Sequence, residues 1–204
     1  MRCARWAAAM AVAMVMVAAV AAQQAPAGGG QRGAGGEPAP PPMRLMSTSF
    51  PDGAQIPAKY TQAGAQVSPA LTWTNAPPNT QSFVLHMHDM EGSRNKTSED
   101  QLHWLIWNIP SSTTSLPEGV PQGPDLKDGS HQTSASGNGV YRGPGAPAAG
   151  PLHHYVFEIF ALDTKVDVAA NASDPFDTRA KVLNAMQGHV VGKAVYMGLF
   201  HRPE

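Results

Sequence analysis

The sequence of 204 residues has a single cysteine, Cys3, and almost no excess of charge of either sign. Its 14 lysines and arginines stand against 15 aspartates and glutamates, which gives a formal net charge of −1. Proteins that bind nucleic acids through the phosphate backbone carry a clear excess of basic side chains. The charge balance therefore excludes that class of protein and predicts that there is no nucleic-acid partner.

Familiar catalytic motifs are also missing. The sequence contains neither the G-x-S-x-G turn of serine hydrolases nor the G-x-x-x-x-G-K loop that holds nucleotide phosphates. Cys3 precedes a hydrophobic run, so a chain that is cleaved after this run has neither a thiol nucleophile nor a disulfide. These absences favour a binding protein without a cofactor over an enzyme.

Residues 1–22 have the pattern of a secretory signal peptide. Arg2 and Arg5 precede residues 7–22, a run of alanine, valine and methionine only. This run is shorter than the roughly 18–20 residues that a membrane-spanning helix needs, and it ends in small residues that suit cleavage. We therefore expect an exported protein, periplasmic or secreted, with no stable membrane span after the signal peptide is cleaved.

Residues 23–43 are predicted to form a disordered linker. Glycine and proline make up 11 of these 21 residues, and such a composition cannot bury a core. The remaining segment, residues 44–204, has the size of one domain with a proper hydrophobic core. The chain is therefore expected to contain one folded domain.

Hydrophobic patterning predicts that this domain is mostly β. Residues 82–88 alternate, so that one face of the strand is apolar and the other carries His86 and His88. The segments 103–109 and 155–162 are apolar on both faces, which is typical of central, covered strands. The long segment from residue 111 to residue 150 is rich in proline, glycine and serine and is expected to form loops.

Two further strands and one helix complete the prediction. The strands are expected at 71–74 and 194–200, and the helix at 177–187. Asp177 is expected to cap the start of this helix, and Gly188 to end it. The apolar face of the helix is predicted to consist of Ala180, Leu183 and Met186.

Histidines are the main candidates for binding or catalysis. Several of them lie at predicted strand ends beside polar partners, as in His88-Asp89 and in His153-His154-Tyr155. A charged imidazole ring and a tyrosine hydroxyl are both hydrogen-bond donors to an anion, and a glycine lets backbone amides approach it closely. A carboxylate such as Asp89 would orient a histidine and favour its charged form.

Five blocks of sequence occur in one order within residues 44–204. They are Ser68-Pro69-Ala70-Leu71-Thr72-Trp73, the strand end at Asp89, His103-Trp104 running into Asn108-Ile109-Pro110, Tyr141-x-Gly143-Pro144-x-x-Pro147, and His153-His154-Tyr155. This arrangement resembles the phosphatidylethanolamine-binding protein (PEBP) family, specifically its bacterial Raf-kinase-inhibitor-like branch. The resemblance implies a β-sandwich in which a central antiparallel or mixed sheet packs on a smaller sheet, with a peripheral C-terminal helix.

The resemblance also implies a small pocket for phosphate-like anions or phospholipid head groups of the phosphatidylethanolamine type. The residues that match the pocket of the family are Asp89, His103, Gly145, Ala146, Pro147, His153 and Tyr155. Family members are also described as inhibitors of kinases or proteases, which implies a protein partner of that kind. The expected function is that of an exported binding protein that modulates a partner enzyme.

Three other interpretations of these residues stay open. The histidine pair in 82–88, together with Glu91, is spaced like the metal ligands of a β-barrel. Asp89, His103 and His153 would be the acid and base of a hydrolase that activates water. A secreted interaction or inhibitor domain with a degenerate pocket would use none of these side chains.

Overall fold

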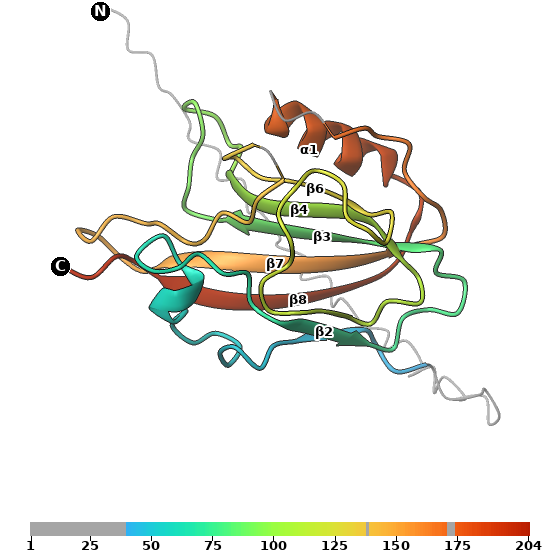
Figure 1. The fold of residues 1–204 in the computed structure, drawn as a ribbon, viewed down its shortest axis with the longest axis horizontal. Helices are drawn as coiled ribbons and strands as arrows, with labels where there is room; N and C mark the ends of the chain where they lie inside the picture. Colours follow the sequence, from blue (N-terminus) through green and yellow to red (C-terminus); the bar gives the residue numbers. More distant parts are fainter. Residues whose placement is uncertain (1–39, 138, 171–173) are drawn as a thin grey trace, which may run out of the picture. The chain divides into compact units, whose positions relative to one another are not determined.

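The computed structural model describes residues 40–137, 139–170 and 174–204 (Figure 1). The predicted signal peptide, and the predicted linker up to residue 39, lie outside these described residues. The elements are β1 (Arg44–Met46), the 3-10 helix η1 (Ala58–Tyr60), β2 (Leu71–Thr74), β3 (Ser82–Asp89), β4 (Gln101–Pro110), β5 (Ser115–Leu116), β6 (His131–Thr133), β7 (His153–Leu162), α1 (Pro175–Ala185) and β8 (Val190–Phe200).

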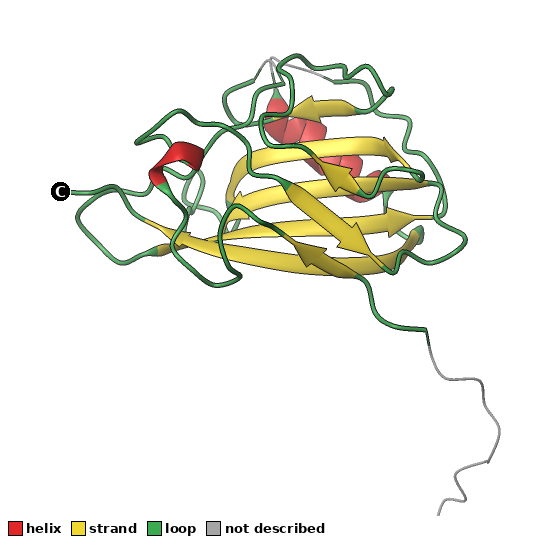
Figure 2. Cartoon of the chain, turned by 60° about the horizontal axis from the view of Figure 1, so that its bottom comes forward, coloured by secondary structure: helices red, strands yellow, loops and turns green. Residues whose placement is uncertain are grey.

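The strands form two antiparallel sheets. The larger sheet has the order β6-β4-β3-β7-β8 and the smaller one the order β1-β2-β5. Figure 2 shows α1 and the smaller sheet on opposite faces of the larger sheet. The predicted β-sandwich with a peripheral C-terminal helix is therefore confirmed, and the strands that are apolar on both faces, β4 and β7, do flank β3 in the centre.

Alternation along β3 divides the interior into two cores. Leu85 and Met87 face the smaller sheet and pack in one core with Trp73 of β2. Val84 faces the other way and packs in a second core with Val182 of α1. Complete burial of a side chain of this size stabilises a fold by about 1.5–3 kcal/mol. The two cores thus fix which face of β3 each side chain occupies, and His86 and His88 share the face that carries α1.

A β-bulge in β4 positions His103. Met87 of β3 pairs with Trp104, and His88 pairs with Leu102, so His103 is an extra residue in β4. Bulges change the direction of a side chain and recur next to functional sites. The ring of His103 accordingly contacts Tyr155 of β7, at 5.0 Å between ring centroids and nearly perpendicular.

The helix begins earlier than the sequence indicated. Asp174, not Asp177, is the N-cap, because its side chain accepts a hydrogen bond from the backbone N of Asp177 at 2.9 Å. Pro175 follows in the first turn, where no N–H donor is needed. The predicted apolar face also needs correction, since Ala180 is exposed and Val182 takes its place in the core.

The segment 111–150 is held by a buried side chain and is not simply a run of loops. Gln132 of β6 accepts a hydrogen bond from Nε1 of Trp104 at 2.9 Å. Its own Nε2 donates to the carbonyl oxygens of Pro121 and Gly123 at 2.7 and 2.9 Å. One glutamine therefore ties two turns of this segment to the central strand β4.

Candidate ligand-binding site

The seven residues implied by the family resemblance all line one cavity of about 190 Å³. It lies where β3 ends and where β4 and β7 begin, because antiparallel pairing brings these three ends to the same edge of the sheet. β3 contributes Asp89, β4 contributes His103, and β7 contributes His153 and Tyr155, while residues 145–147 form the adjoining loop.

Asp89 is the centre of the hydrogen bonding at this edge. Its Oδ1 accepts from the backbone N of Glu91 and of Gly92, at 3.0 and 3.1 Å. Nδ1 of His153 lies 3.0 and 2.9 Å from its two carboxylate oxygens. A buried carboxylate is tolerated when donors surround it in this way. Asp89 thus orients a histidine, and that histidine is His153.

The hydroxyl group of Tyr155 holds the adjoining loop of residues 145–147. Its hydroxyl oxygen accepts hydrogen bonds from the backbone N of Gly145 and of Ala146, at 3.2 and 3.0 Å. Burial, followed by the negative charge of Asp89, raises the pKa of Tyr155 well above its usual range. The two amides that were expected to face an anion are therefore used by Tyr155, which anchors the loop to β7.

His103 is not the charged donor that the sequence analysis expected. Its Nδ1 donates to the carbonyl oxygen of Arg142 at 2.9 Å, which leaves Nε2 as the ring nitrogen for a ligand. Burial lowers the pKa of His103 to about 4, although that hydrogen bond and the charge of Asp89 oppose the shift. His103 is therefore neutral at pH 7, and its Nε2 is left as a hydrogen-bond acceptor.

A neutral, buried His103 makes stability sensitive to acid. Its pKa rises from about 4 in the folded state to about 6.5 in the unfolded state, so the unfolded state binds the proton more tightly. The folded protein therefore has its full stability above pH 6.5, where His103 is neutral in both states. This stability decreases below pH 6.5 and is lost as the pH falls through 4. We expect acidification from pH 7 to below 4 to cost the wild type about 3 kcal/mol more than His103→Asn, measured by urea unfolding. If the wild type and His103→Asn lose equal stability on acidification, the lowered pKa of His103 is contradicted. The control is His189→Asn, which removes an exposed histidine and should lose as much stability as the wild type.

A family model described as phosphatidylethanolamine-binding protein matches residues 46–201. The chain belongs to the PEBP family. A UPF0098 protein from Methanothermobacter thermautotrophicus is 39% identical over 161 residues, which cover 78% of this chain and 99% of that relative. A UPF0098 protein from Aquifex aeolicus is 32% identical over 160 residues, covering 78% of this chain and 89% of that relative.

Two solved structures resemble the chain over most of its length. The PEBP homologue CT736 from Chlamydia trachomatis has a TM-score of 0.67 and 27% identity, covering 79% of this chain and 98% of that one. YbcL from Escherichia coli has a TM-score of 0.66 and 24% identity, covering 78% and 98%. This similarity shows that the chain also has the fold of PEBP proteins.

The sequence analysis missed several of the residues that line this cavity. They are Gln62, Gly92, Ser93, Gln101 and Arg142. Arg142 occupies the variable position of the Tyr141-x-Gly143-Pro144 block, so the block itself held a signal. Gln62 follows η1, far from the other lining residues in the sequence, and donates from Nε2 to the carbonyl oxygen of Gly143 at 2.8 Å. No local pattern predicts that contact.

Two groups of side chains within the described residues have the composition of a metal site. In each group three ligand atoms lie within 4.8 Å of one another, and the groups are Asp89, Glu91 and His153 at the PEBP cavity, and His86, His88 and Glu158 on the face that carries α1. The interpretation that joined Glu91 to the histidine pair of β3 is wrong. The carboxylate of Glu91 instead lies 2.5 Å from Nδ1 of His154, and Glu158 takes the place beside the pair.

Proposed function

We propose that this PEBP protein is an exported binding protein whose cavity takes a phosphate-like group, either free or as the head group of a phospholipid of the phosphatidylethanolamine type. The observation that carries the proposal is one small cavity lined by Arg142, whose positive charge acts on the buried His103, and by the His153–Asp89 pair. A guanidinium group with its fixed fork of donors suits phosphate oxygens well.

The size of the cavity supports a small ligand group. Its volume of about 190 Å³ is below the usual range for pockets that take drug-sized ligands. A phosphate or a phosphoethanolamine group fits this volume, and acyl chains do not. We therefore infer that a phospholipid would engage the cavity by its head group alone.

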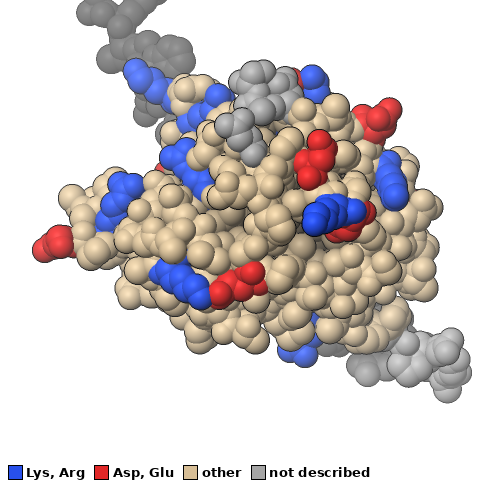
Figure 3. Space-filling model, viewed as in Figure 1, with Lys and Arg blue, Asp and Glu red and all other residues tan. Residues whose placement is uncertain are grey.

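The charges around the cavity suit a group that carries both signs. Arg142 lines the cavity, and Nη2 of Arg202 donates to Gln62 Oε1 at 3.0 Å beside it. Asp89 also lines the cavity and Glu91 lies beside Asp89, so an ethanolamine ammonium group would meet carboxylates there. Figure 3 shows charged side chains of both signs on one face, with several of the Lys and Arg side chains on its left and upper-left part. The arrangement of charges at the cavity favours one small zwitterionic group.

Isothermal titration of the protein with inorganic phosphate and with phosphoethanolamine tests this proposal. We expect both to bind, and phosphoethanolamine to bind more tightly if the source is a lipid head group. Equal affinities would indicate free phosphate. Arg142→Ala should weaken binding by about 1.5–3 kcal/mol, the usual value for a charged hydrogen bond. Arg44→Ala, at an exposed arginine of β1, is the matched control.

The same titration can reject the proposal. If neither compound binds the wild type at millimolar concentration, or if Arg142→Ala binds as well as Arg44→Ala does, the cavity is not an anion site. A secreted interaction domain with a degenerate pocket would then be the better interpretation of the function.

Export rests on the sequence of residues 1–22, which lie outside the described residues. In the described part of the chain, no helix has the length and hydropathy to cross a membrane. N-terminal sequencing of the protein recovered from producing cells tests export, with a start between residues 22 and 25 expected. A start at Met1 in membrane fractions would contradict it.

A further inference from the structure

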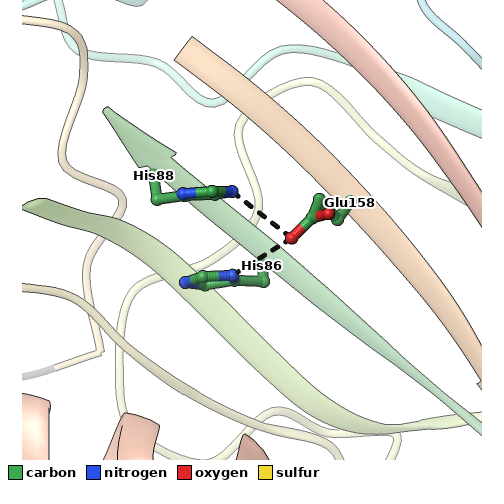
Figure 4. Close-up of side chains that lie close together, drawn as sticks. All are labelled: His86, His88 and Glu158. Atoms are coloured by element: carbon green, nitrogen blue, oxygen red, sulfur yellow. Dashed lines mark ion pairs between the residues drawn. The ribbon is translucent and has the colours of Figure 1, made fainter. Parts of the chain in front are cut away.

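A second cluster of polar side chains lies on the face of the larger sheet that carries α1 (Figure 4). His86 and His88 come from β3, and Glu158 of β7 is the direct cross-strand partner of His86. Oε2 of Glu158 lies 3.3 Å from Nε2 of His88 and 3.6 Å from Nδ1 of His86. Because side chains alternate along β3, this cluster is separated from the cavity by the sheet itself.

The two histidines are buried without a full set of hydrogen bonds. His86 is 5% exposed and His88 is 8% exposed, and Nε2 of each ring has no hydrogen-bond partner. Buried polar atoms are normally paired, because an unpaired one costs stability. Nε2 of His88 points toward Oε2 of Glu158, with which it forms an ion pair at 3.3 Å, so this ring nitrogen is directed into the cluster (Figure 4).

The distances fit a shared metal ion. Zinc binds histidine nitrogen and carboxylate oxygen at about 2.0–2.2 Å, so two ligand atoms of one tetrahedral ion lie about 3.3–3.5 Å apart. The two contacts of Glu158 Oε2 with the histidine rings are close to this separation. The rings themselves are stacked, with centroids 4.4 Å apart and planes at 6°, so they must tilt slightly for both lone pairs to converge.

Surrounding groups orient two of the three ligand atoms. Nδ1 of His88 is hydrogen-bonded to Asp100, which leaves Nε2 as the coordinating nitrogen. Metal-bound histidines characteristically donate their other nitrogen to a carboxylate in this way. Asp100 is held in turn by Nη1 of Arg179 at 2.7 Å, and Lys193 pairs with Oε1 of Glu158, which leaves Oε2 for the cluster.

The charge state of the cluster and the access to it also allow a cation. Burial lowers the pKa of His86. In His88 the effect of burial is outweighed by Asp100 and Glu158, which raise its pKa to about 9. A metal ion at this cluster must therefore displace a proton from Nε2 of His88. Glu158 and Asp100 add two negative charges that Lys193 and Arg179 balance. The side chain of Glu158 remains 16% exposed, so an ion can reach the cluster from solvent beside Glu158.

We propose that His86, His88 and Glu158 form a binding site for a divalent transition-metal ion such as Zn²⁺. Two imidazole nitrogens and one carboxylate oxygen are a known protein ligand set for zinc, with the fourth position taken by water. This site is separate from the phosphate-like ligand of the proposed function and does not depend on it. On binding, the metal ion takes the place of any proton on His88 Nε2, and that proton is released to solvent.

The experiment uses the exported chain without a histidine tag, after metal removal with a chelator. Co²⁺ is titrated and followed by its visible absorption, and Zn²⁺ is then used to displace it. We expect one equivalent of each ion to bind and Zn²⁺ to raise the melting temperature. Glu158→Gln, which keeps the side-chain size, should lower the affinity at least tenfold, and Asp100→Asn about 10- to 100-fold. Histidine ¹⁵N spectra should show coordination through Nδ1 of His86 and Nε2 of His88.

Two variants control for other metal sites. His189→Ala removes an exposed histidine whose Nδ1 contacts Asp163 at 2.9 Å, and it should leave Co²⁺ binding unchanged. His153→Gln removes a ligand of the Asp89–Glu91–His153 group and should also leave it unchanged. Loss of binding in His153→Gln with retention in Glu158→Gln would overturn the proposal, as would a wild type that binds neither ion at micromolar concentration.

Discussion

Asp89→Ala is expected to lower the free energy of unfolding by about 3–5 kcal/mol and to abolish ligand binding at the cavity. The carboxylate is buried and satisfies three donors: the backbone N of Glu91, the backbone N of Gly92 and Nδ1 of His153. Alanine leaves all three without an acceptor, and breaking a buried pair in this way costs about 3–5 kcal/mol. Urea unfolding measures the stability loss, and titration with phosphoethanolamine measures the binding.

Asp125→Ala is a matched control for that experiment. Asp125 also pairs with Nδ1 of a histidine, His131 at 2.6 Å, but its side chain is 71% exposed. Exposed pairs of this kind contribute about 0–1 kcal/mol. Asp89→Asn keeps one acceptor oxygen and should lose less stability than Asp89→Ala. If Asp89→Ala and Asp125→Ala lose the same small amount, Asp89 does not organise this edge of the sheet.

Gln132→Ala is expected to lower the free energy of unfolding by about 3–5 kcal/mol. The substitution leaves Nε1 of Trp104 and the carbonyl oxygens of Pro121 and Gly123 without partners. Nε1 of Trp104 is buried, and an unpaired buried group costs about 1–3 kcal/mol. The removal of the buried Gln132 side chain also leaves a cavity, whereas Pro121 and Gly123 are less deeply buried. Urea unfolding again measures the loss.

Gln132→Leu separates the two causes, because leucine fills most of the space but restores none of the hydrogen bonds. A loss close to that of Gln132→Ala would assign the effect to hydrogen bonding. Gln187→Ala, at an exposed glutamine beyond α1, should change stability by about 0.5 kcal/mol or less. A Gln132→Ala variant as stable as this control would show that the segment 111–150 does not depend on Gln132.

The sequence predicted the central strands because their signals are local. The alternation around His86 and His88 is visible in the residues themselves, and burial on both faces gives 155–162 a continuous apolar run. The start of α1 was misplaced because Asp174 and Asp177 are both suitable caps, and only the fold decides between them. The tertiary anchor Gln132 gave no signal, since its partners lie in turns without a periodic pattern.

The lining residues of the candidate site were predictable, but their roles were not. The sequence blocks identified Asp89, His103, His153 and Tyr155, because motif residues keep their order along the chain. The charge of His103 depends on how deeply it is buried, and a bulge in β4 determines that depth. The role of the Tyr155 hydroxyl depends on where the 145–147 loop closes. Glu158 was not linked to His86 because cross-strand register sets that contact.

Neighbouring residues of β3 belong to different sites, since His88 faces α1 and Asp89 faces the cavity. A substitution on one face of this strand can therefore alter one site and leave the other intact. A change in length is different, because inserting or deleting a single residue within 82–89 would exchange the two faces for every side chain beyond it. During evolution this segment is thus free to vary in residue type at either site separately, whereas a single-residue change in its length that no bulge takes up would affect both.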